Sequence, residues 1–322
     1  MTQKTTRKGK EHVPVLLREA MAFLAPCSGG LYVDGTFGAG GYSTALLETT
    51  DCQVVGIDRD PVALEEGAAV ARRFPGRLAL IEGCFGDMAT LLATRNLAGV
   101  DGVALDLGIS SLQLDTPERG FSFQADGPLD MRMGRTSPTA ADVVNACSET
   151  ELTRILHELG EERLARRIAR AIVVARPITR TTQLAAVVQR VVPRSHDGLD
   201  PATRTFQALR LFVNDEPEEL RRALVGSEQA LAPGGRLVVV AFHSLEDRAI
   251  KRFFRVRAGH LPHVSRHRLE TPCGQAPTFR VLTRRAVRPS AAETAANPRA
   301  RSARLRAVER TAAPAWHDDL NG

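Results

Sequence analysis

The chain has 322 residues, of which 43% are hydrophobic and 25% are charged, a composition typical of a soluble protein with a substantial core. The longest uninterrupted apolar stretch, Leu237–Phe242, is far shorter than the roughly 20 residues that a membrane-spanning helix needs. No apolar segment follows the basic N-terminus, which argues against a secretory signal, and the five cysteines form no C-x-x-C pair. We therefore expect a cytoplasmic protein with reduced cysteines and no membrane partner.

The formal net charge of +6 is distributed unevenly along the chain. The segment from Arg248 to Gly322 holds 16 Lys and Arg against 5 Asp and Glu, a net charge of +11, so the preceding 247 residues carry a net charge of −5. A basic segment on a mildly acidic body suggests a polyanionic partner that is contacted through its phosphates. The alternative is a solvated tail that improves solubility.

The first third of the chain alternates short apolar runs with helical stretches. We predict helices over residues 42–48, from Pro61 onward and over 88–96. The intervening apolar runs predict strands over residues 30–35, 52–58, 77–83 and 102–108. Such alternation indicates βαβ units and a parallel sheet that is buried on both faces.

The alternation then stops, and residues 111–216 contain no predicted strand. Predicted helices cover residues 151–176, begun by a Ser148–Glu151 capping box, then 181–192, ended by Pro193, and 201–216. After a further helix that ends at Pro-Gly-Gly, residues 236–243 predict a fifth strand and 278–284 an antiparallel edge strand. The fold class is therefore α/β with an inserted all-helical domain. Residues 1–110 and 217–290 form the α/β domain, residues 111–216 the helical insertion, and residues 291–322 a basic, partly disordered tail.

The glycine-rich stretch after the first strand, "DGTFGAGGYS", predicts a cofactor loop. It lacks the Lys of a P-loop, and the third glycine of a dinucleotide fingerprint falls on Ser43. An acidic residue followed by three residues and G-x-G, here Asp34, Gly38 and Gly40, is the pattern of S-adenosylmethionine (SAM) methyltransferases. SAM has no pyrophosphate; it needs glycines for close approach, and its α-amino group favours a carboxylate, a role suited to Asp34.

Two further carboxylates end predicted strands. Asp58 ends the second strand, where it can accept hydrogen bonds from both ribose hydroxyls of SAM or, equally, of NAD. Asp106 ends the fourth strand within "DLGISS", where methyltransferases that act on exocyclic amines keep an acidic or amide residue. Accepting an amine N–H there would turn the nitrogen toward the methyl donor, so that transfer relies on positioning and requires no metal.

Three other groups of residues carry alternative interpretations. His260, His263 and His267 near Cys273 have the composition of a zinc site, but Pro262 and the surrounding arginines favour surface or phosphate-contacting histidines, and we predict no metal. Four arginines between 163 and 170 are accompanied by glutamates, which favours a salt-bridged solvent face. Residues His243, Glu246 and Asp247 are either site residues or a helix start capped by Ser244.

Together these motifs resemble the bacterial 16S rRNA cytosine-N4 methyltransferases of the MraW/RsmH family. The resemblance covers residues 11–310 and rests on stretches such as "DGTFGAGG", "GIDRDP", "LDLGISS", "RGFSFQADGPLDMRM", "GEERLARRIARAI", "PATRTFQALR", "FHSLEDR" and "NPRARSARLR". It implies a SAM-binding Rossmann-like domain and N4-methylation of cytosine 1402 in the decoding region of 16S rRNA, on the small (30S) ribosomal subunit. It leaves monomer and homodimer both open.

The resemblance also implies roles for individual residues. Asp106 would be the catalytic residue, near the methionyl end of SAM and the target base. The implied cofactor contacts are Gly40, Gly41, Tyr42, Asp58, Phe85 (flanking the adenine), Asp106 and Gln113. The chain departs from the family pattern at Tyr42 (usually His), Leu112 (usually Pro), Gly134 (usually an acid) and Asp200 (usually His). An NAD-dependent oxidoreductase and a non-enzymatic RNA-binding assembly factor are the rival classes.

Overall fold

The computed structural model describes residues 14–135, 137–193, 200–260 and 275–316, and the chain divides into two compact units. The first unit consists of Met1–Asp58, Val62–Gly108 and Arg222–Gly322, and the second of Arg59–Pro61 and Ile109–Arg221. Among the described residues, none of the helices is long and apolar enough to cross a membrane.

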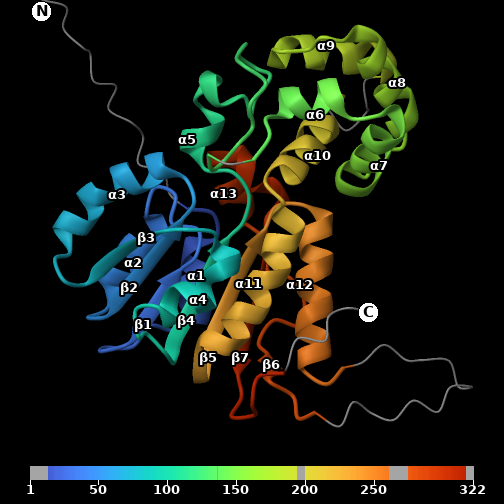
Figure 1. Ribbon diagram of the computed structural model, residues 1–322. Helices are drawn as coiled ribbons and strands as arrows, with labels where there is room; N and C mark the ends of the chain where they lie inside the picture. Colours follow the sequence, from blue (N-terminus) through green and yellow to red (C-terminus); the bar gives the residue numbers. More distant parts are fainter. Residues whose placement is uncertain (1–13, 136, 194–199, 261–274, 317–322) are drawn as a thin grey trace, which may run out of the picture. The chain divides into compact units, whose positions relative to one another are not determined.

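The first unit is built on a seven-stranded sheet with the order β3-β2-β1-β4-β5-β7-β6 (Figure 1). Its first five strands run parallel, and β7 and β6 are antiparallel. The strands are β1 (Leu31–Asp34), β2 (Gln53–Asp58), β3 (Leu78–Glu82), β4 (Val100–Asp106), β5 (Leu231–Ala241), β6 (Phe279–Val281) and β7 (Arg304–Arg310). The predicted parallel sheet and the antiparallel edge strand β6 are confirmed.

Helix α1 precedes the first strand, and the other helices of this unit lie between or after the parallel strands, as the βαβ pattern predicts. The helices are α1 (Leu17–Leu24), α2 (Gly41–Thr49), α3 (Pro61–Arg73), the short η1 (Phe85–Asp87), α4 (Met88–Ala93), α11 (Glu216–Ala230) and α12 (Ser244–Arg257). Helix α11 ends at Ala230, before the Pro-Gly-Gly that we predicted as its stop. That tripeptide instead lies within β5, at a register shift against β4.

The prediction of a partly disordered tail over residues 291–322 is wrong for its described part. Residues there form α13 (Ala291–Ala296), η3 (Pro298–Ser302) and β7. Strand β7, drawn in red in Figure 1, lies between β5 and β6 and pairs with β5 from Arg236↔Glu309 to Ala241↔Arg304. Leu305, Ala307 and Val308 on this strand are fully buried, so the C-terminal segment completes the sheet and is part of the core.

The second unit is helical around its own hydrophobic core, and its described residues contain no named strand. Its helices are α5 (Ser111–Leu114), η2 (Pro117–Arg119), α6 (Ala140–Ala146), α7 (Glu149–Gly160), α8 (Ala165–Ala175), α9 (Thr181–Val191) and α10 (Thr203–Val213). Buried residues at helical spacing, such as Leu152, Ile155 and Leu156 of α7, supply this core.

The single helix predicted over residues 151–176 is wrong, because it is two helices. Helix α7 ends where Glu161 takes a left-handed conformation (φ 47°) and its N–H bonds to the Leu156 carbonyl. A Cβ on the preceding Gly160 would lie 2.9 Å from the Arg204 carbonyl oxygen of α10, so the glycine permits close packing there. At the other end, Ser148 caps α7 by accepting from the Glu151 N–H, which confirms one half of the predicted capping box; the return bond from the Ser148 N–H to the Glu151 side chain is not among the contacts of the described residues.

Candidate cofactor and active site

Three aspartates end neighbouring strands of the first unit. Asp34 ends β1, Asp58 ends β2 and Asp106 ends β4. In the register of the sheet, Asp34 pairs with Gly56 on one side and with Ala104 on the other, so the other two carboxylates lie two residues further along their strands. This is the carboxyl edge of the sheet, where α/β proteins bind their ligands.

Asp34 ties the glycine loop to the start of α2. One carboxylate oxygen accepts from the N–H (3.1 Å) and the hydroxyl (2.7 Å) of Ser43, and the other accepts from the Thr36 N–H at 3.3 Å. Burial raises the pKa of Asp34 to about 6, although these hydrogen bonds oppose the shift. Both carboxylate oxygens accept hydrogen bonds from the protein, and Asp34 is only 1% exposed. We therefore assign Asp34 a role in shaping the loop, in place of the expected contact with the α-amino group of a cofactor.

The close approaches that require glycine in this loop are to protein side chains. A Cβ on Gly40, which has a φ of 75°, would lie 2.7 Å from the ring of Phe37, and one on Gly41 would lie 2.1 Å from Pro14. The Phe37 ring is 2% exposed and packs inside the loop. The glycines therefore allow the loop to close over its own phenylalanine.

Asp58 and Phe85 both lie close to the backbone of the glycine loop. Asp58 accepts a 2.8 Å hydrogen bond from the Gly38 N–H while remaining partly exposed. The Cβ of Phe85, in the turn after β3, would be 3.5 Å from a Cβ on Gly35 at the end of β1, and the Phe85 side chain is also partly exposed. A hydrogen-bond acceptor and an aromatic ring thus border the same edge of the sheet.

Asp106 combines shielding with an unused acceptor. Its Oδ1 is buried and has no hydrogen-bond partner among the described residues, although the residue as a whole is partly exposed. Burial, and then the carboxylates of Asp34 and Glu246, raise the pKa of Asp106 well above its usual range. Its N–H donates to Thr36 Oγ1 at 2.7 Å, which fixes the strand end. A buried acceptor without a partner calls for a ligand that supplies an N–H or a positive charge.

Comparison with known proteins identifies the family. The model of the MraW methylase family matches residues 9–311. The chain belongs to the MraW methylase family. It is 59% identical to a protein of Rhodospirillum rubrum over 95% of this chain and 96% of that protein, and 57% identical to one of Paramagnetospirillum magneticum over 95% and 97%; both are named ribosomal RNA small subunit methyltransferase H. A solved rRNA-methylase from Streptococcus thermophilus aligns over 94% of this chain and 99% of that chain with a TM-score of 0.43 at 10% identity, too weak a likeness to support an argument.

In this member of the MraW family, the Tyr42 side chain belongs to the core. Its hydroxyl donates to the Val15 carbonyl at 2.6 Å, the residue is 4% exposed, and burial raises its pKa well above the usual value. A cofactor contact at this position therefore falls to the backbone, which the replacement of the family's usual histidine leaves intact.

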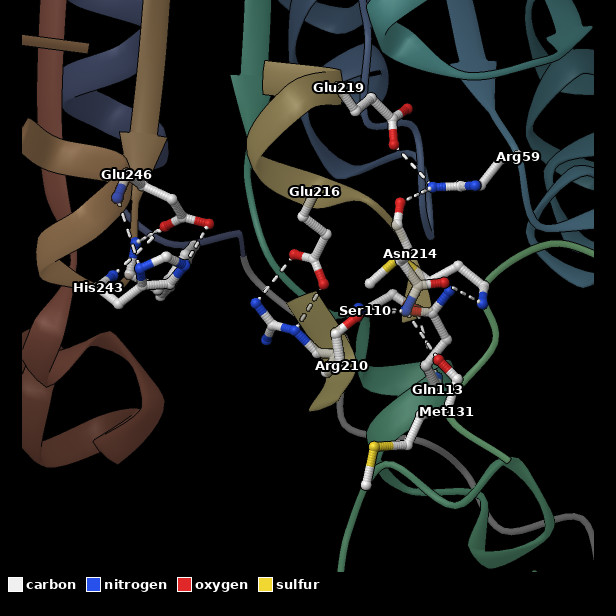
Figure 2. Close-up of polar contacts among 12 residues, drawn as sticks. Arg59, Ser110, Gln113, Met131, Arg210, Asn214, Glu216, Glu219, His243 and Glu246 are labelled. Carbon is white, nitrogen blue, oxygen red and sulfur yellow. Dashed lines mark hydrogen bonds and ion pairs between the residues drawn. The ribbon is translucent and has the colours of Figure 1, made fainter. Parts of the chain in front are cut away.

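Gln113 belongs to the second unit, and both ends of its amide have partners there; Figure 2 shows Gln113 beside Ser110. Its Nε2 donates to Asp60 at 2.8 Å, and its Oε1 accepts from the Ser110 N–H at 3.1 Å to complete a capping box for α5. Arg119 pairs with the same Asp60 carboxylate at 2.8 Å. These contacts organise the "LDLGISS" and "RGFSF" motifs around Asp60, which the sequence did not identify as a site residue.

His243 and Glu246 form the start of α12, seen at the left of Figure 2. His243 is the N-cap and accepts from the Glu246 N–H, while Glu246 accepts from the backbone of Phe242 and His243. The prediction that Ser244 caps this helix is therefore wrong by one residue. His243 and Glu246 have a structural role, and Glu246 also contributes negative charge near Asp106.

Part of the C-terminal positive charge is used inside the fold. Arg306 and Arg304 pair with Asp247 at 2.7 and 3.0 Å, and Arg257 pairs with the buried Glu228 at 2.8 Å. Arg310, 8% exposed, donates to backbone carbonyls. The net charge of this segment therefore overstates its surface charge, although other basic residues, such as Lys251, Arg252 and Arg255 of α12, are exposed. Of the histidine cluster only His260 is described; the rest, with Cys273, lies outside the described residues.

Proposed function

We propose that this chain is a SAM-dependent methyltransferase that methylates N4 of cytosine 1402 in 16S rRNA on the small ribosomal subunit. Membership of the MraW methylase family supports methyl transfer, and relatives named for small-subunit rRNA match nearly the whole chain. The carboxyl ends of the parallel strands β1, β2 and β4 lie at the edge of the sheet where α/β proteins bind such a cofactor.

One observation favours SAM over a dinucleotide: a protein carboxylate already fills the N-terminus of α2. In dinucleotide-binding folds the pyrophosphate lies against the N–H groups at this helix end. Here the N–H of Ser43, in the first turn of α2, donates to the buried Asp34, and the Gly38 N–H donates to Asp58. Residues 34–49 also contain no Lys or Arg to balance a phosphate. The loop therefore suits a ligand without phosphates.

The residues at the edge of the sheet fit the parts of SAM. When bound, SAM supplies a methyl group on a positively charged sulfur. Asp58 accepts hydrogen bonds from the ribose hydroxyls, Phe85 packs against the adenine, and the backbone at Gly40, Gly41 and Tyr42 lines the loop. The raised pKa of Asp106 and its unpartnered Oδ1 suit a site in which a cation or an amine completes the carboxylate's environment.

Asp106 then orients the amine of the target cytosine. The cytosine N4 lone pair is delocalised into the ring, so N4 must be turned for in-line attack on the methyl group. A carboxylate that accepts one N–H holds that orientation, and positioning supplies most of the rate enhancement. Gln113 supports the site indirectly by holding Asp60, the second residue after Asp58.

Product analysis tests the reaction: small subunits from a strain that lacks the enzyme should gain N4-methylcytidine at position 1402 when incubated with the protein and SAM. Binding without product would favour the assembly-factor alternative, and a thermal shift with NADH instead of SAM would favour the oxidoreductase.

Calorimetry tests whether Asp58 contributes to the SAM-binding site. Asp58→Ala should weaken SAM binding at least 10-fold, whereas Asp51→Ala, at an 86% exposed carboxylate, should not. Equal SAM affinity in both variants would refute the ribose role.

A further inference from the structure

Helix α8 presents an arginine-rich face to solvent. Arg166, Arg167 and Arg170 lie at helical spacings of three and four residues, which places them on one side of the helix, and Arg163 lies in the turn just before it. All four side chains are exposed. The opposite side of α8 packs into the core of the second unit through Ala165, Ile168, Ala169 and Ile172. We call these four residues the α8 arginine face.

The side chains of the α8 arginine face make no ion pair or hydrogen bond with any described residue, and they are clustered, whereas Arg135 and Arg190, the other described and exposed arginines of the unit without such a partner, stand alone. Seven arginines of the second unit pair with carboxylates, even at exposed positions such as Arg154 with Glu158 and Arg180 with Asp126. The predicted salt-bridged face around residues 158–170 is therefore wrong for these four residues, since Glu158 pairs with Arg154 and the buried Glu162 accepts from the Leu164 N–H.

The second unit as a whole is not basic. Its residues include 16 arginines, no lysine, and 17 Asp and Glu. The four unpaired arginines are thus a local concentration of positive charge on a unit that is close to neutral. A partner that recognises them must carry closely spaced negative charge.

The position of these arginines is also electrostatically unfavourable for the free protein. Arg166 and Arg167 lie in the first turn of α8, where the helix dipole is positive, and no acidic residue is present in that turn. Leu164 at the N-cap makes no side-chain cap hydrogen bond. The local structure therefore gains nothing from these cations, which is typical of residues retained for binding.

We propose that the α8 arginine face binds the phosphate backbone of the rRNA substrate. This proposal rests on the proposed function, because it takes rRNA as the substrate. Arginine suits the role since its planar guanidinium pairs with phosphate through two parallel hydrogen bonds, and the positive end of the α8 dipole adds to the attraction. Arg166 and Arg170 are separated by about 6 Å along the helix axis, so the face can contact more than one phosphate.

The test compares two triple variants of the full-length protein that lose the same charge. One replaces Arg166, Arg167 and Arg170 with Gln; the control replaces Arg154, Arg180 and Arg221, which are 40–54% exposed but ion-paired. Binding to unmethylated small subunits is measured as a function of salt. Loss of three phosphate contacts should reduce the slope of log K against log salt by about 2–3 and weaken binding more than 10-fold, while the control keeps the wild-type slope.

Three further readouts separate the possible outcomes. The α8 variant should bind SAM normally and melt no lower than the wild type, because it removes cations from the positive end of a helix. If the wild type methylates subunits but the α8 variant keeps its salt slope, the phosphate-binding face is refuted while the proposed function stands. If the slope changes on subunits but not on a naked 16S rRNA transcript, the partner is an acidic ribosomal protein and the RNA assignment is overturned.

Discussion

Leu305→Ala tests whether the C-terminal segment is a core strand. Leu305 is fully buried in β7, where it pairs with Val240 of β5 and packs in the main core cluster of the first unit. Truncating a buried leucine to alanine costs about 2–5 kcal/mol, because the transferred apolar surface is lost and a cavity remains. We expect the upper part of this range, since strands on both sides of β7 limit its relaxation.

The only tryptophan, Trp316, provides the assay. It is 8% exposed, its indole N–H donates to the Ala276 carbonyl at 2.9 Å, and it lies beside Arg257, so its fluorescence reports the integrity of this part of the sheet. With a denaturant slope of about 2–3 kcal/mol/M, the Leu305→Ala transition in urea should occur about 1–2 M earlier than in the wild type.

Arg301→Ala is the control for the Leu305 experiment, because Arg301 is exposed in the preceding turn η3. Its loss removes a positive charge from the same segment and should change stability by no more than about 0.5 kcal/mol. A Leu305→Ala protein with the wild-type midpoint would show that residues 304–310 do not form part of the core.

Two further predictions concern buried polar groups. Burial raises the pKa of Asp34 from its ordinary value of 3.8 to about 6, so its contribution to stability is full below pH 3.8 and is lost as the pH rises through 6. The free energy of unfolding of the wild type relative to Asp34→Asn, measured in urea, should therefore fall by on the order of 3 kcal/mol from pH 4 to pH 7, and a constant difference would contradict this. Asn214 bonds to the backbone of Met131 and Met133 at 2.8 Å (Figure 2), so Asn214→Ala should destabilise the helical unit by about 2–5 kcal/mol and speed its hydrogen exchange, whereas unchanged exchange would refute that role.

Strand positions were predictable where apolar residues run together. The runs in β2, β4 and β5 are long enough to identify buried parallel strands, and Asp58 and Asp106 could be placed because they end such runs. Strand β7 was missed because "RLRAVER" reads as a charged segment. Arg304 and Arg306 of β7 pair with Asp247 of α12, and Glu309 of β7 pairs with Arg236 of β5 and Arg280 of β6. These pairings depend on the tertiary structure and are not visible in the sequence.

The role of Asp34 could not be derived from spacing alone. The sequence shows an acid before a glycine loop, but the partners of that acid, Ser43 and Thr36, depend on how the loop folds back. Thr36 also receives the Asp106 N–H, and no sequence signal distinguishes it from other threonines in loops. Similarly, the break between α7 and α8 depends on a left-handed glutamate, a conformation that composition does not indicate.

The glycine loop therefore specifies its ligand mainly by exclusion. Phe37 requires Gly40, Pro14 requires Gly41 and Leu105 requires Gly35, while Gly38 has a positive φ of 52°, so the presence of these glycines alone would suit any ligand or none. What separates the ligand classes is the buried Asp34 at the start of α2, which satisfies a helix terminus that a pyrophosphate would otherwise occupy. Because burial, and then the carboxylates of Asp34 and Glu246, raise the pKa of Asp106, a positively charged ligand at this edge of the sheet would be stabilised. A sulfonium cofactor has no pyrophosphate and carries a positive charge, so it meets both conditions. Its demethylated product also has no pyrophosphate, but its sulfur is neutral.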